Sequence, residues 1–405
     1  MLIPVSWRNI WRNKVRSLVI ITAIALGITA GVFSTAFMKG MMDKRIDTAI
    51  QTEISHIQIH DSLFRKTSEM KYIIPDVSSL TDSIRAIPHV VGVSPRIVIQ
   101  SMVSSAETGA GVKISGIYPD EEKQVTNIFE KITNGKYFEG IKRNPVVIGE
   151  KLAKKLNVHV RSKVVITLQD MDRNLTAGAF RVAGIYKTAN SAFDESNIYV
   201  RFDDLAALID LPKDACHEIA IRLDNNESTL AVQHKIKTIV PSLEVLNWKE
   251  ISPEMSYITE VMDMYMYIFI IIILLALLFG IINTMLMVVL ERTKEIGMLM
   301  AIGMSKLKIF SMVILETVML SLTGGISGVI LGTLISKYFE THVIDMSMWS
   351  EGYAQLGYDS MINTSLDTNM LITVTIMVVI TGIIAAIYPA WKALRNDPAD
   401  ALRME

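Results

Sequence analysis

The sequence has only one cysteine, Cys216, among its 405 residues. A single cysteine excludes a disulfide within the chain and leaves the redox compartment open. The sequence also lacks a Gly-x-x-x-x-Gly-Lys-Ser/Thr phosphate loop, a Gly-x-Ser-x-Gly motif and a His-Glu-x-x-His motif. We therefore expect no catalytic centre and no bound nucleotide, magnesium or other cofactor in this chain.

Neither sign of charge is in excess, since 40 Lys and Arg residues face 41 Asp and Glu residues. Basic residues are not concentrated in any soluble stretch, so nucleic acid is not a predicted partner. Half of the residues are hydrophobic. That share is high for a soluble protein and low for a chain that lies entirely in lipid, so we expect membrane spans together with a soluble part.

Four apolar runs are long enough to cross a bilayer. Leu18–Phe37 has 20 residues without charge, and Met264–Leu290 has 27. The third run, Ile309–Ser336, contains Glu316, and the fourth is Met370–Ala390. About 20 residues cross the hydrocarbon core, so the second run is expected to continue beyond the membrane as a stalk. We expect Glu316 to contact a polar group of another helix, and a role in transport is the alternative.

Residues 40–255 have recurrent charges and apolar runs of strand length, which predicts a folded water-soluble domain. Predicted strands and helices alternate, so we expect α+β packing in two lobes. The expected strands are Ile54–His60, Val90–Met102, Gly111–Ile117, Val164–Leu168, Phe180–Tyr186, Ser196–Val200, Glu218–Leu223 and Leu243–Leu246. The expected helices are Leu80–Ile87, Glu121–Ile132, Glu150–Leu156, Asp203–Ile209 and Thr229–Val240, and Asp170–Gly178 is expected to be an exposed loop.

The distribution of basic residues predicts the orientation of the spans. Residues 1–16 carry four Lys and Arg, the segment Glu291–Lys308 carries four, and residues 337–369 carry only Lys337. The positive-inside rule therefore places both termini and Glu291–Lys308 in the cytoplasm and the large domain outside. Residues 1–17 are expected to form an amphipathic helix in the headgroup region, and Asp397–Asp400 has the composition of a helix start.

The predicted parts are an interfacial helix (1–17), a first span (18–39), an extracytoplasmic domain (40–255), a stalk and second span (256–290), a cytoplasmic segment (291–308), a third span (309–336), an outer loop (337–369), a fourth span (370–390) and a cytoplasmic tail (391–405).

The segment Glu291–Lys308 is predicted to contain a short helix of about two turns. Gly303 is expected to end this helix, and Ser305 is expected to cap the next one. Its apolar side chains need cover, which a groove on a partner would provide. The alternative is a helix at the membrane surface that only turns the chain around.

Several motifs resemble the FtsX/MacB superfamily of ABC-transporter permeases. They are Glu291–Gly297 with Ala301–Gly303, the tail Tyr388–Arg403, and Val146–Ala153. Other motifs are most similar to the lipoprotein-releasing, Lol-type permeases, namely Trp7–Lys14, Ser55–His60, and Phe180–Tyr186 followed by Phe193–Ser196. The resemblance covers the whole chain.

This resemblance implies a protein of the cytoplasmic (inner) membrane with four transmembrane helices and an extracytoplasmic α+β domain like the MacB periplasmic core domain. It implies that the short helix after Glu291 sits on a separate ATPase, present in two copies, which binds ATP and magnesium. The implied function is mechanical extraction of lipoproteins from the outer leaflet. Further implied partners are a second permease, identical or similar, and a periplasmic carrier. The alternatives are a peptide or macrolide exporter and an FtsX-like transmitter that regulates a cell-wall hydrolase.

Two sets of residues are assigned to these roles. The expected ATPase-coupling residues are Glu291, Arg292, Glu295, Ile296, Gly297, Leu299, Met300, Ile302 and Gly303. A substrate entrance is expected between the first and second spans of opposing subunits, open to the outer leaflet, and its expected lining is Val32, Phe33, Phe37, Met262, Tyr265 and Met266, because flexible and aromatic side chains suit acyl chains. Ordinary packing against lipid is the alternative for the second set.

One further pair of residues raises the possibility of a metal site. His56 and His60 are expected on the same face of a strand, but no third ligand has a suitable spacing. We therefore expect two surface histidines and no metal.

Overall fold

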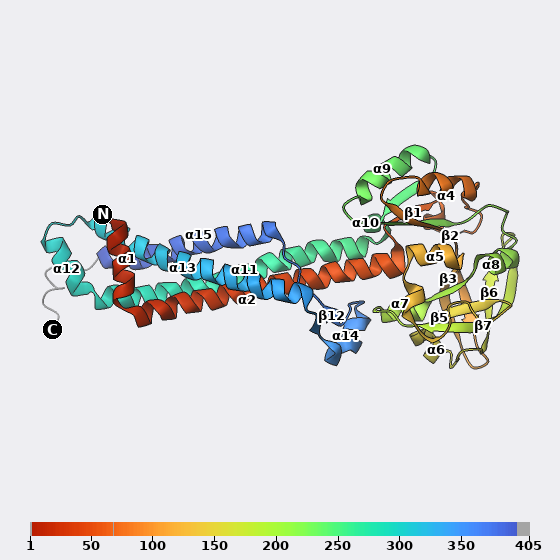
Figure 1. The fold of residues 1–405 in the computed structure, drawn as a ribbon, viewed down its shortest axis with the longest axis horizontal. Helices are drawn as coiled ribbons and strands as arrows, with labels where there is room; N and C mark the ends of the chain where they lie inside the picture. Colours follow the sequence, from red (N-terminus) through yellow and green to blue (C-terminus); the bar gives the residue numbers. More distant parts are fainter. Residues whose placement is uncertain (1, 68, 395–405) are drawn as a thin grey trace. The chain divides into compact units, whose positions relative to one another are not determined.

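The computed structural model describes residues 2–67 and 69–394 (Figure 1). By its internal contacts the chain divides into two units. The helical unit contains Met1–Asp43, Thr259–Asp345 and Ile362–Glu405. The α+β unit contains Lys44–Ile258 and Met346–Met361. The helix start predicted at Asp397 lies outside the described residues.

Four helices are long and apolar enough to cross a membrane. They are α2 (Lys14–Ala49), α11 (Pro253–Glu291), α13 (Lys306–Thr341) and α15 (Thr368–Leu394). Helices α2 and α11 have 36 and 39 residues, whereas about 20 residues cross the hydrocarbon core. Both therefore have enough residues to continue beyond a bilayer, as the long second apolar run predicted for α11.

Glycines on α13 allow two other helices to approach it closely. A Cβ atom added to Gly332 would lie 2.8 Å from Cβ of Val32 on α2. A Cβ atom added to Gly325 would lie 2.8 Å from Cγ1 of Val378 on α15. Small residues at helix interfaces permit this close packing in a membrane, where water does not drive the helices together. Helix α13 therefore packs against both α2 and α15.

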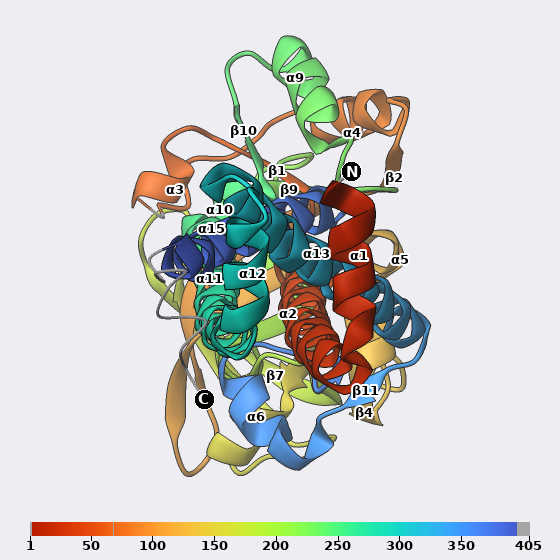
Figure 2. The same cartoon turned by 90° about the vertical axis from the view of Figure 1, so that its left-hand side faces the viewer.

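Two short helices lie at one end of the helical unit (Figure 1). They are α1 (Leu2–Arg12) and α12 (Thr293–Ala301). Seen from that end, α1 lies beside α13 (Figure 2). The predicted end of the short helix in Glu291–Lys308 is confirmed, because Gly303 has a φ angle of +99° just after α12. Ser305 directly precedes α13, as predicted. The side chain of Ser305 makes no capping hydrogen bond.

The α+β unit contains one sheet of ten strands. The strands are β1 (Ile57–His60), β2 (Val90–Ser104), β3 (Gly109–Ile117), β4 (Ile132–Gly135), β5 (Pro145–Gly149), β6 (Lys163–Gln169), β7 (Leu175–Tyr186), β8 (Asn197–Arg201), β9 (Glu218–Leu223) and β10 (Glu244–Asn247). Their order is β10-β1-β9-β2-β3-β8-β5-β7-β4, and β6 pairs with both β2 and β7.

The pairing of β6 closes part of this sheet into a ring made of β2, β3, β8, β5, β7 and β6. Strands β9, β1 and β10 continue from β2 as an open extension. The α+β class is thus confirmed. The two expected lobes do not correspond to two sheets, because β2 is long enough to pair in both regions, with β9 over one part and with β3 and β6 over the other.

The helices of this unit are short. They are α3 (Phe64–Thr67), α4 (Val77–Arg85), α5 (Pro119–Val125), α6 (Glu150–Lys155), α7 (Ser191–Ser196), α8 (Phe202–Ile209), α9 (Thr229–Ile239), α10 (Trp248–Ile251) and α14 (Ser350–Gln355). A π-helical turn follows α2 at Ile50–Ile54, and 3₁₀ turns occupy Ile128–Lys131 and Ser347–Trp349. The two-residue strands β11 (Ile344–Asp345) and β12 (Met361–Ile362) complete the elements described.

Two predicted elements of this unit differ from the structure. The helix expected over Glu121–Ile132 ends at Val125, because Thr126 is extended and its hydroxyl donates to Glu122 at 2.9 Å. The loop expected over Asp170–Gly178 is shorter, since β7 pairs with β6 from Leu175 onward.

The prediction that His56 and His60 are surface residues is wrong. Both side chains are buried, and the ring of His60 stacks on that of Phe64. Nδ1 of His56 accepts a hydrogen bond from the backbone N–H of Leu223 at 3.2 Å. Burial lowers the pKa of His56 to about 4, so its ring is neutral at physiological pH. Among the residues that the structure describes, no group of three or more His, Cys, Asp or Glu is placed to hold a metal ion.

Candidate functional site

The helix α12 presents two apolar side chains to its surroundings. Met298 is 53% exposed and Ile302, the residue that ends the helix, is 78% exposed. They are four residues apart, so they lie on the same side of the helix. Met298 was missed in the sequence analysis, although its i, i+4 spacing from Ile302 was visible there.

The opposite side of α12 packs inside the helical unit. Ile296 is only 3% exposed, Gly297 is buried, and Met300 packs against the same hydrophobic cluster. Leu299 is half-buried between the two sides. Ile296 was predicted to contact the ATPase directly. The structure corrects this, because the 3.6-residue period of α12 turns Ile296 toward the chain's own core.

The glutamates of this region are held by arginines from the N-terminal part of the chain. Both carboxylate oxygens of Glu295 accept hydrogen bonds from Arg12 of α1, at 2.6 and 2.7 Å. Glu291 forms an ion pair with Arg16, in the first turn of α2. The hydrogen bond from Arg12, followed by the one from Arg292, lowers the pKa of Glu295. Glu295 was predicted as an ATPase-coupling residue, and in the structure its carboxylate is bound by arginines of the chain itself.

Arg292 joins this region to the third span. Its guanidinium donates to both carboxylate oxygens of Glu316 at 3.0 and 3.1 Å, and it also donates to Glu295 at 3.0 Å. The side chains of Arg292 and Glu316 are only 16% and 6% exposed. The interpretation of Glu316 as a polar contact between helices is therefore confirmed. Loss of one partner would leave a charge buried and unpaired, which typically costs about 3–5 kcal/mol.

These charged groups surround a polar cavity of about 320 Å³. Its walls come from the α1–α2 corner, the end of α11, the start of α12 and the third span. The lining residues are Asn9, Ile10, Arg12, Asn13, Arg16, Ser17, Ile20, Met285, Val288, Glu291, Arg292, Glu295, Glu316 and Leu320. Because its three arginines and three glutamates balance, the cavity has no marked preference for a charged ligand.

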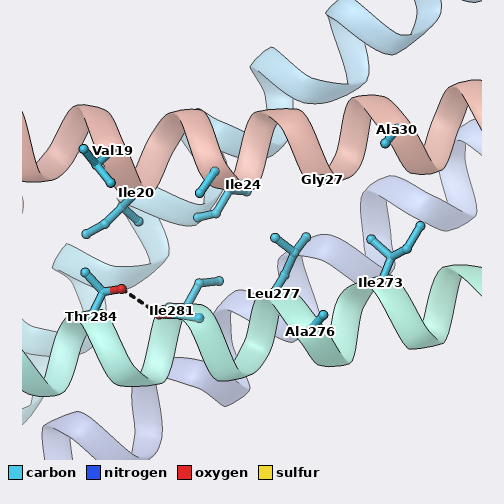
Figure 3. Close-up of a pocket in the computed structure, with 12 residues that line it drawn as sticks. Val19, Ile20, Ile24, Gly27, Ala30, Ile273, Ala276, Leu277, Ile281 and Thr284 are labelled. Atoms are coloured by element: carbon cyan, nitrogen blue, oxygen red, sulfur yellow. Dashed lines mark hydrogen bonds between the residues drawn. The ribbon is translucent and has the colours of Figure 1, made fainter.

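A second cavity, of about 410 Å³, lies between α2 and α11 and is almost entirely apolar (Figure 3). It is lined by Val19, Ile20, Ala23, Ile24, Gly27, Ala30, Ile273, Ala276, Leu277, Gly280, Ile281 and Thr284. The one hydroxyl among these residues belongs to Thr284, and it donates to the carbonyl of Gly280 on its own helix. The small residues Gly27, Ala30 and Ala276 leave the space open.

None of the six residues predicted to line a substrate entrance lines this cavity. Val32 is buried against α13, and Met266 is also buried. Phe33 stacks with Phe37, and Tyr265 is exposed. The sixth residue, Met262, is half-buried. The predicted entrance lies between opposing subunits, so a cavity within one chain does not test it, and the assignment of these six residues stays a prediction.

Two family models match the chain and together cover most of it. The MacB-like periplasmic core domain matches residues 17–239, and the C-terminal domain of FtsX-like permeases matches residues 267–398. The second match contains α12 and Glu316, and the first contains most of the α+β unit. The domain that matches the periplasmic core family is therefore extracytoplasmic, and the four apolar helices belong to a membrane permease.

Similar proteins include two kinds of transporter. The lipoprotein-releasing system transmembrane protein LolC of Xylella fastidiosa is 23% identical over 332 residues, which cover 78% of this chain and 79% of LolC. The macrolide export ATP-binding/permease protein MacB of Chlorobium luteolum is 34% identical over 172 residues, which cover 42% of this chain and 23% of MacB. The solved periplasmic region of MacB from Actinobacillus actinomycetemcomitans is 14% identical, with a TM-score of 0.34, and the match covers 54% of this chain and 98% of that region.

Proposed function

Because the chain belongs to the FtsX/MacB family of ABC-transporter permeases, we propose that it is a mechanical permease. In this proposal a separate ATPase hydrolyses ATP and moves the extracytoplasmic domain through the spans. The observation that carries the proposal is α12, a short helix between two spans that exposes Met298 and Ile302. Exposed apolar side chains in line on one helix suit a groove on a partner protein.

The ATPase is expected in two copies, and ATP and magnesium are expected to bind there rather than in this chain. We propose the cytoplasmic membrane as the location, with both termini and α12 in the cytoplasm. The excess of basic residues at 1–16 and 291–308 supports this orientation. It puts α12 on the side of the membrane where ATP is available.

The proposed lever consists of α2 and α11, whose lengths exceed the thickness of a bilayer. Each of these helices begins or ends in the α+β unit and is continuous with a span. A helix transmits displacement along its axis, because its backbone hydrogen bonds run in that direction. We propose that two permeases, identical or similar, work together so that their paired levers close against each other.

We propose lipoproteins of the outer leaflet as the substrate, released to a periplasmic carrier. The lining of the apolar cavity between α2 and α11 suits an acyl chain, and the end of the cavity at Ala30 and Ile273 is the part nearest the outer leaflet in the proposed orientation. The proposed acyl-chain site therefore contains Ala30 and Ile273, and the entrance predicted between opposing subunits stays a separate prediction. Similarity to LolC supports the same substrate class.

Export of macrolides or peptides is a second candidate, favoured by the 34% identity to a MacB protein. A third candidate is an FtsX-like transmitter that regulates a cell-wall hydrolase, favoured by the match of the FtsX-like model to the spans. These candidates use the same lever and differ in what the outer domain engages.

Photocrosslinking in membranes tests the proposed substrate. A crosslinking amino acid at Ala30 or Ile273 is expected to capture lipoprotein when the membranes are irradiated without ATP, and to capture less when ATP is added before irradiation. The matched control is Ile376, which is exposed on α15 and is expected to capture only bulk lipid. Crosslinking at Ala30 and Ile273 to bulk lipid alone would refute lipoprotein release, and a macrolide-sensitive or hydrolase adduct would favour the alternatives.

A further inference from the structure

The charged side chains around α12 form one connected network within the chain. Arg12 binds Glu295, Glu295 binds Arg292, and Arg292 binds Glu316. A second pair joins Arg16 to Glu291, which precedes Arg292 in the chain and so connects this pair to the others. The network thus connects four elements: α1, the first turn of α2, the α11–α12 corner and α13.

The pairs in this network differ in their exposure. The Arg12 and Glu295 side chains are both substantially exposed, whereas the pair Arg292–Glu316 is almost fully enclosed. Exposed pairs contribute little to stability, but an enclosed pair with two hydrogen bonds has one preferred geometry. The pair Arg292–Glu316 therefore holds the start of α12 in one position against α13.

Helix α1 is held by contacts besides the ion pairs. The hydroxyl of Ser6 donates to the carbonyl of Met312 on α13 at 3.4 Å, and Ile10 is buried in the helical core. At the corner between α1 and α2, the hydroxyl of Ser17 donates to the carbonyl of Ile10 at 2.5 Å. These contacts leave α1 little freedom to move independently of α2 and α13.

We propose that α1 and α13 form one coupling unit with α12, and that Arg292 and Glu316 are its positioning residues. This inference rests on the proposed function, because it assumes that an ATPase displaces α12. Arg292 and Glu316 carry that displacement to the third span, and Arg12 and Arg16 carry it to α1 and to the base of α2. In this proposal Glu291 and Glu295 bind arginines within the permease, and Met298 and Ile302 contact the ATPase.

Matched substitutions on α13 separate this role from simple folding. Glu316→Gln keeps the shape of the side chain and removes its charge, and Glu340→Gln is the same change at an exposed position of the same helix. We expect Glu316→Gln to retain ATPase co-purification and to lower ATP-driven substrate release about tenfold, whereas Glu340→Gln has no effect on either. The charge exchange Arg292→Glu with Glu316→Arg is expected to recover part of the release.

Spin labels measure whether α1 moves with α12. With Cys216 replaced, labels at Arg8 on α1 and Lys294 on α12 are expected to keep the same separation with and without bound ATP. In the variant Glu316→Gln, which weakens the enclosed pair that holds α12 on α13, that separation is expected to change when ATP binds.

The possible failures of the two proposals are distinguishable. If the unaltered permease does not co-purify with an ATPase, the proposed function is wrong. If it does, and Glu316→Gln still releases substrate at the normal rate or the unaltered α1–α12 separation changes on ATP binding, the coupling unit is wrong while the function stands.

Discussion

Replacing Ile302 with Asp is expected to detach the ATPase without unfolding the permease. Ile302 is 78% exposed, so a partner that covers it buries nearly the whole side chain. Burial of an isoleucine side chain contributes about 1.5–3 kcal/mol, and burial of an unpaired carboxylate costs several kcal/mol more. Because about 1.4 kcal/mol is a factor of ten in the dissociation constant, we expect the affinity for the ATPase to fall by at least about tenfold.

The measurement is co-purification of the ATPase with the detergent-solubilised permease, followed by ATP hydrolysis in reconstituted vesicles. Met348→Asp is a control for general effects of an added charge, because Met348 is also highly exposed but lies between α13 and α15. Ile296→Asp is the opposite control. It places a carboxylate in the helical core and is expected to lower the expression level and the thermal stability. Leu299→Asp is expected to weaken ATPase binding and to lower thermal stability, each in part, because Leu299 is half-buried.

Retention of full ATPase association and turnover by Ile302→Asp would refute this reasoning. In that case α12 would be only a turn between two spans, and its exposed apolar side chains would contact lipid. Loss of association together with loss of thermal stability would also contradict the prediction, since Ile302 has few contacts to lose within the chain.

Three other predictions follow from the described residues. With Cys216 replaced, a cysteine introduced at Asp120 is expected to react with a membrane-impermeant thiol reagent in intact cells, and a cysteine at Lys306 is expected to be protected. The reverse labelling pattern would overturn the proposed orientation. Burial lowers the pKa of His56 from 6.5 to about 4 in the folded state. Between pH 6.5 and pH 4 the unfolded chain therefore binds a proton at His56 that the folded chain does not bind. Stability is therefore expected to fall by up to about 3 kcal/mol as the pH drops through that range, and denaturant titrations should show a smaller loss for His56→Gln. Gly328→Ala is expected to lower thermal stability by about 1–3 kcal/mol, because its Cβ would lie 2.7 Å from a backbone oxygen of α2. Gly280→Ala, which has nothing within 4 Å, should be neutral or slightly stabilising in the same thermal measurement.

Local sequence patterns were sufficient for the membrane part and for the α12 loop. Apolar runs of about 20 residues or more, with at most one charge, predict spans, because an unpaired charge is costly in hydrocarbon. Gly303 and Ser305 predicted where one helix ends and the next begins, since the end of a helix depends on the backbone preferences of a few neighbouring residues. The alternation of short strands and helices was likewise sufficient for the α+β class.

Tertiary structure alone decided which side chains of the candidate site are available to a partner. Glu295 has the composition of a surface contact, but the residue that binds it, Arg12, is 283 positions away in the chain. The burial of Ile296 and of His56 depends in the same way on helices and strands that pack against them from distant parts of the sequence. A pattern of neighbouring residues shows that a side chain needs cover, but only the packed fold shows whether the chain itself or another protein provides it.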